Sequence, residues 1–170
     1  MKKLRISLIV LALLAILLMT SGPASASSSV TIIEFQGTQS CWGPDMTPYM
    51  TFLPSGIIQV RDWPLTCTNA VYDVKTGLPV DPVNVTHTAY YSAMMKPDGT
   101  GQDWGDCPGS GWQAHFEGDM TATGSTGYIH AVGVPGGPYE GMMFQMHGMA
   151  NESTGWEFVL TGQLIIPNNK

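Results

Sequence analysis

The fold class is decided by one stretch of the chain, Trp112-Gln113-Ala114-His115-Phe116-Glu117-Gly118-Asp119-Met120. Its even positions are apolar or glycine, and its odd positions are polar. Alternation with a period of two is typical of a β-strand that buries one face. The stretch therefore predicts a strand whose apolar side chains face a core and whose polar side chains face solvent.

Segments of similar composition lie on both sides of this stretch, and turn residues such as Pro97-Asp98-Gly99 separate them. We expect Pro64 to end one of them. No segment shows the periodicity of an amphipathic helix. The sequence therefore predicts an all-β domain, an antiparallel up-and-down β-barrel of about eight strands, with a β-sandwich as the alternative. The segments with strand composition are 30–35, 50–53, 57–63, 67–74, 83–95, 112–120, 128–134, 139–149 and 156–165.

The order of glycines and aromatic residues resembles that of small exported bacterial β-barrel proteins similar to the calycin and allene-oxide-cyclase-like barrels. The resemblance rests on Gly56–Arg61, Asp98–Gly105, Gly111–Gly118 and Gly162–Ile165, and it extends over about residues 56–166. It implies a barrel that encloses an apolar pocket. It makes the segment from Cys67 to Pro82 an insertion, and it transfers no catalytic residue.

The N-terminal segment 1–26 has the three parts of a secretory signal peptide. Basic residues come first, the apolar run Ile6–Met19 contains only one polar residue, and Ala24-Ser25-Ala26 offers a cleavage site. We therefore expect a single domain over 27–170 that is secreted or periplasmic. No second apolar run predicts a membrane span after removal of the signal.

Charge and cysteine content narrow the classes of partner. The full chain has a formal charge of −6, and removal of Lys2, Lys3 and Arg5 with the signal leaves a more acidic protein. Nucleic acid and anionic lipid are therefore not expected partners. An exported chain with Cys41, Cys67 and Cys107 is expected to form one disulfide. We favour Cys41–Cys67 because these two are closest in the chain, although the other pairings remain open.

Aromatic and methionine-rich strands suggest an interior that can hold a ligand. An eight-stranded barrel has room for one small ligand. Our leading hypothesis is thus an exported protein that binds a small hydrophobic molecule without a cofactor. The candidate ligand-binding residues are Phe116, Met142, Phe144, Met146, Trp156 and Phe158.

Two alternative functions need no apolar pocket. One is a non-catalytic cell-envelope or extracellular interaction module with an exposed aromatic patch around Trp42, Trp63 and Trp104. The other is a periplasmic copper-binding protein, because thioether and imidazole groups suit Cu(I). Its ligands would come from one face of a strand, namely Met143, His147 and Met149.

Catalysis is the least supported alternative. A cyclase or isomerase would need His115 or Glu117 inside the barrel, whereas the alternation predicts that both face solvent. Three acidic residues, Asp98, Asp103 and Asp106, are expected to belong to a solvated turn. Their spacing does not match an EF-hand calcium loop.

Overall fold

The structure, a computed structural model, describes residues 29–151 and 156–168. The predicted signal peptide lies outside these ranges. Within them the chain is all β apart from one short 3-10 helix, which confirms the predicted class. The elements are β1 (Val30–Trp42), η1 (Thr47–Tyr49), β2 (Met50–Phe52), β3 (Ile58–Asp73), β4 (Thr86–Met95), β5 (Gly101–Gly109), β6 (Trp112–Thr121), β7 (Gly124–Gly133), β8 (Met143–Asn151) and β9 (Glu157–Pro167).

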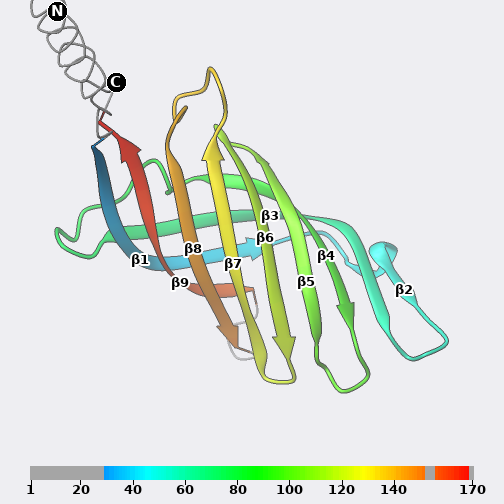
Figure 1. The fold of residues 1–170 in the computed structure, drawn as a ribbon. Coiled ribbons are helices and arrows are strands. Elements are labelled where there is room, and N and C mark those ends of the chain that lie inside the picture. Colours follow the sequence, from blue (N-terminus) through cyan, green and yellow to red (C-terminus); the bar gives the residue numbers. More distant parts are fainter. Residues whose placement is uncertain (1–28, 152–155, 169–170) are drawn as a thin grey trace, which may run out of the picture.

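Eight strands close into an antiparallel up-and-down barrel (Figure 1). Strands β3 to β9 pair with their neighbours in chain order, and β1 closes the barrel by pairing with both β9 and β3. The short β2 adds to β3 beside the barrel. Because the ladder returns to its first strand, the barrel is confirmed and the sandwich alternative is wrong. The architecture is consistent with that of calycin-like barrels.

The expectation that Pro64 ends a strand is wrong, because β3 runs without interruption from Ile58 to Asp73. Pro64 lies after the stretch of β3 that pairs with β2, which ends at Val60. It also precedes the stretch that pairs with β1, which begins at Thr66. A proline is tolerated where a strand has a neighbour on one side only, because its missing N–H is not needed there.

Side chains alternate between the barrel interior and solvent, as the pattern of residues 112–120 predicts. In β6, Trp112 and Ala114 are buried and Phe116 is half-buried, whereas His115 and Glu117 are exposed. The inward side chains of all strands form one hydrophobic core. Its largest fully buried members are Phe35, Leu160, Leu164, Val60, Val71 and Val83.

The loop between β3 and β4, residues 74–85, closes one end of the barrel. Val80 and Val83 of this loop belong to the buried core. The indole Nε1–H of Trp112 donates a hydrogen bond of 2.6 Å to the Pro82 carbonyl. Cys67–Asp73 belongs to β3, so the segment expected to be an insertion is partly barrel strand and partly the cover of this end.

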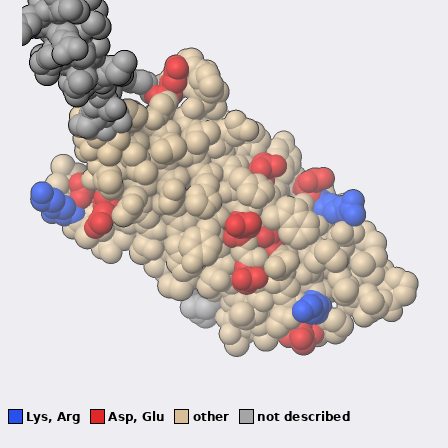
Figure 2. Space-filling view, viewed as in Figure 1, with Lys and Arg blue, Asp and Glu red and all other residues tan. Residues whose placement is uncertain are grey.

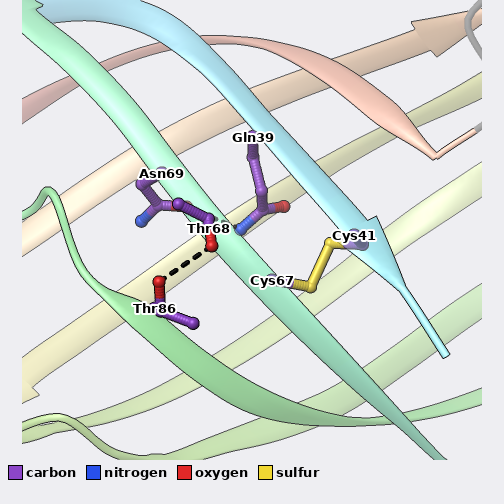
Figure 3. The surroundings of a disulfide bond; sticks show 6 residues. All are labelled: Gln39, Cys41, Cys67, Thr68, Asn69 and Thr86. Atoms are coloured by element: carbon purple, nitrogen blue, oxygen red, sulfur yellow. Dashed lines mark hydrogen bonds between the residues drawn. A yellow bond between two sulfur atoms is a disulfide. The ribbon is translucent and has the colours of Figure 1, made fainter.

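The contact between β1 and β3 carries a disulfide (Figure 3). Cys41 and Cys67 are direct partners in the register of the two strands, and they are bonded. Cys107 is a buried free thiol. Next to the disulfide, the buried Gln39 amide donates a 2.9 Å hydrogen bond to Asn69 Oδ1. The barrel is therefore joined at this contact by a covalent bond and by a satisfied polar pair.

Few charged groups cover the outside. Figure 2 shows acidic side chains scattered over the viewed face, with the basic side chains near its margins. None of the helices in the described ranges has the length and apolarity that a bilayer span requires.

Candidate ligand-binding cavity

The barrel is hollow at the end opposite the 74–85 loop. An inner cavity of about 60 Å³ lies in the interior, and a vestibule of about 190 Å³ lies beside the β4–β5 and β6–β7 turns. The two spaces are adjoining, since five residues line both of them. These shared residues are Tyr91, Asp103, Ser125, Trp156 and Phe158.

Strand alternation directs the lining side chains inward. The lining comes from several strands, and it includes Tyr91 of β4, Asp103 of β5, Phe116 of β6 and Phe158 of β9. Trp156 directly precedes β9. Because side chains of neighbouring strands on the same face lie close together, these residues converge from around the barrel wall.

The aromatic rings of the lining form a continuous cluster. Tyr91 and Phe116 are stacked with their ring centroids 6.1 Å apart. Trp156 meets Tyr91 edge-on at 5.3 Å and lies 6.5 Å from Phe158. Trp63, which is buried, supports Trp156 from behind at 5.3 Å. Ring pairs with these separations stabilise one another, so the apolar wall is preorganised.

Asp103 is the acidic group of the lining. Burial raises the pKa of its carboxyl to about 6, with a smaller contribution from the nearby Asp119 charge, whereas a hydrogen bond from the Tyr91 hydroxyl opposes the rise. Burial likewise raises the pKa of Tyr91, so its hydroxyl stays protonated at neutral pH. That hydroxyl also lies 3.5 Å from Met120 Sδ, a much weaker acceptor than a carboxylate.

His87 on β4 lines the inner cavity farther along its strand. Burial lowers the pKa of its imidazole, so the ring is neutral at pH 7. Its Nδ1 atom is enclosed and has no hydrogen-bond partner among the described residues. The inner cavity thus offers one neutral polar group in addition to the Asp103–Tyr91 pair.

The structure divides the predicted ligand-binding residues among three places. Phe116, Trp156 and Phe158 line the inner cavity together. Phe144 and Met146 are buried core residues beside a smaller space of about 20 Å³, which shares His87, Cys107 and Ile129 with the inner cavity. Met142 packs against the core from the turn before β8, because this strand begins at Met143 and not at residue 139 as predicted.

Sequence reasoning missed Tyr91, His87 and, above all, Asp103. It assigned Asp103 to a solvated turn together with Asp98 and Asp106. That assignment is wrong for Asp103, because β5 begins at Gly101 and alternation places Asp103, Gly105 and Cys107 on the inner face. The available signal was Cys107, an apolar residue four positions after Asp103, because residues four apart in a strand lie on the same face.

The alternative sites lie on the outer face of the barrel. Met143 and Met149 are exposed, and the ring of His147 packs against Tyr128 at 4.7 Å. His115 is also exposed, and its Nδ1 lies 2.9 Å from Asp106 Oδ1. The described residues contain no group of three or more His, Cys, Asp or Glu side chains placed to hold a metal ion.

The predicted aromatic patch on the surface does not exist in the form expected. Trp42 and Trp104 are exposed, but Trp63 is only 5% exposed. Trp63 donates a 3.1 Å hydrogen bond from its indole nitrogen to the Pro44 carbonyl and belongs to the core. This correction follows from a register shift in β3 between Val60 and Trp63, after which the odd positions from Trp63 to Val71 face inward.

Comparisons with known proteins do not identify a family. No family model, no curated protein and no solved structure matches this chain.

Proposed function

We propose that this protein binds a small, largely apolar ligand in the inner cavity and vestibule of its barrel. The observation that supports the proposal is the hollow itself, which is lined by aromatic rings and closed at one end by the 74–85 loop. Aromatic walls with a few polar groups are typical of small-molecule sites. The binding residues are Tyr91, Asp103, Phe116, Trp156 and Phe158.

The volumes limit the size of the ligand. An apolar cavity of about 150 Å³ accommodates a benzene molecule. The vestibule of about 190 Å³ therefore has room for one ring with a short substituent, and the inner cavity of about 60 Å³ for a small group beyond it. A long-chain lipid does not fit without rearrangement of the core.

Benzyl alcohol is a suitable probe, because it combines one ring with one polar group. We expect it to change the tryptophan fluorescence through Trp156 and to saturate with a Kd of about 1 mM. Phe158→Ala removes part of the wall and should weaken binding about tenfold.

Phe52→Ala is the matched control, because Phe52 is 71% exposed on β2 and lies away from the cavity. Circular dichroism of both variants shows whether the barrel is retained. Absence of saturation up to about 10 mM, or equal effects of the two substitutions, would refute the proposed function.

We also propose that the ligand is bound outside the cytoplasm, in the periplasm or after secretion. The Cys41–Cys67 disulfide supports this, since such bonds persist in oxidising compartments. The mass of the exported protein is the test. A chain that starts at Ser27 would agree with export and cleavage, whereas an uncleaved chain retained in the cytoplasm would contradict both.

A further inference from the structure

We propose that the ligand is an organic cation, an amine or ammonium group on an apolar body, and that Asp103 is its counter-ion. This inference rests on the proposed function and specifies the ligand class of the same cavity. It is carried by three features of the vestibule, namely an inward carboxylate, the absence of a basic residue from its lining among the described residues, and the aromatic rings of that lining.

The fold provides a place for the carboxylate of Asp103. In the sheet register, Asp103 of β5 is the partner of Ala93 on β4 and of Gly118 on β6. A Cβ atom at Gly118 would collide with Asp103 Oδ1. The carboxylate therefore occupies the space that the missing side chain of Gly118 leaves, and it borders both the inner cavity and the vestibule.

No protein cation balances this carboxylate in the described part of the chain. Neither space is lined by a described lysine or arginine, and the charged neighbour is another acid, the exposed Asp119. The Tyr91 hydroxyl and the backbone N–H of Asp103 each supply one hydrogen bond. A carboxylate can accept about four, so about half of its acceptor sites remain for a ligand. Asp103 is half-buried, and a charge that is partly removed from water and lacks a charged partner is unfavourable, so a cationic ligand would relieve this cost.

The rings beside Asp103 favour the same class of ligand. Tyr91, Trp156 and Phe158 line both spaces that Asp103 borders. The face of an aromatic ring attracts a cation, most strongly for tryptophan and when water is excluded. An ammonium group in the vestibule would thus meet a carboxylate and π-faces at once, while its apolar body contacts the rings.

The net charge of the whole protein also favours a cationic ligand. The formal charge of the chain is −6, which attracts cations and repels carboxylates and phosphates. An anionic ligand would also approach Asp103 directly. Anionic lipophiles are therefore the class that this cavity disfavours most.

Three probes of nearly equal shape separate charge from size: benzylamine, benzyl alcohol and benzoate. At neutral pH they carry a positive charge, no charge and a negative charge. We expect the wild-type protein to bind benzylamine at least about tenfold more tightly than benzyl alcohol, and to show no saturation with benzoate. This comparison requires no mutation, so it does not depend on the folding of a variant.

Asp103→Asn then tests the role of the carboxylate. We expect the preference of this variant for benzylamine over benzyl alcohol to fall from at least about tenfold to about onefold, because the neutral amide no longer pairs with the ammonium group. Asp106→Asn is the control, because Asp106 lies on the same strand and faces solvent. It should leave both affinities unchanged.

The outcomes distinguish this inference from the proposed function. If benzyl alcohol binds as tightly as benzylamine, or if Asp103→Asn and Asp106→Asn behave alike, the barrel binds ligands but the cation assignment is wrong. If none of the three probes binds, the proposed function fails and the cation assignment fails with it.

Discussion

The disulfide between β1 and β3 should account for a large part of the stability of this barrel. Cys41 and Cys67 are 26 residues apart in the chain and are direct partners across the strand pair that closes the sheet. A cross-link of this span lowers the entropy of the unfolded chain, which corresponds to about 3.5 kcal/mol at 25 °C. Breaking the bond should therefore reduce the free energy of unfolding by about that amount.

Two perturbations break the bond in different ways. Reduction of the wild-type protein removes no atom, whereas Cys41→Ala with Cys67→Ala also removes both sulfurs. For a domain of this size, a loss of about 3.5 kcal/mol lowers Tm by about 7–14 °C. Urea unfolding should in addition show a larger m-value without the bond, because the unfolded chain exposes more surface.

The control is Cys107→Ala, which removes the sulfur of a buried free cysteine and leaves the cross-link intact. We expect it to lower Tm by much less than either perturbation of the disulfide. The reasoning is refuted if reduction leaves Tm within about 2 °C of the oxidised protein, because 3.5 kcal/mol cannot produce so small a shift. It is also refuted if Cys107→Ala is as harmful as the double substitution.

Two further predictions concern packing and protonation. Gly105→Ala should lower the free energy of unfolding by about 1–3 kcal/mol, because its Cβ would collide with the Tyr90 carbonyl oxygen and the Phe116 ring. Gly127→Ala, whose nearest contact would be 3.1 Å, should lose less, and equal losses in urea titrations would contradict this account. Burial raises the pKa of Asp103 from 3.8 to about 6, so the folded state holds this proton more tightly than the unfolded state. The free energy of unfolding should therefore fall as the pH rises from about 4 to about 6, by up to about 3 kcal/mol, and Asp103→Asn should abolish this fall. Parallel stability profiles of the two proteins between these pH values would contradict the raised pKa of Asp103.

The architecture could largely be predicted from the alternation of polar and apolar residues within single segments of the chain. Residues 112–120 predict which side chains of β6 face inward, and the structure agrees at each described position. The reason is that strand geometry sends successive side chains to opposite faces, so parity within one segment suffices. Export by a signal peptide and the expected classes of partner were inferred from the sequence alone, and they stay predictions.

The candidate site could be predicted only in part from the sequence, because the strand boundaries near it were predicted wrongly. Pro64 suggested a break, and the register shift between Val60 and Trp63 that turns Trp63 inward was missed. Glycines before Asp103 suggested a turn, so an inward carboxylate was placed in solvent. In both cases pairing with neighbouring strands outweighed the local propensity of proline and glycine.

The sequence by itself thus determined the class of the fold and the faces of its strongest strands, because both depend on residues close together in the chain. Only the tertiary structure decided which end of the barrel holds the cavity and which side chains meet there. Those properties depend on the packing of loop 74–85 against the core and on the register of β4, β5, β6 and β9 around the closed sheet. Contacts between residues far apart in the chain set both, and no local pattern contains them.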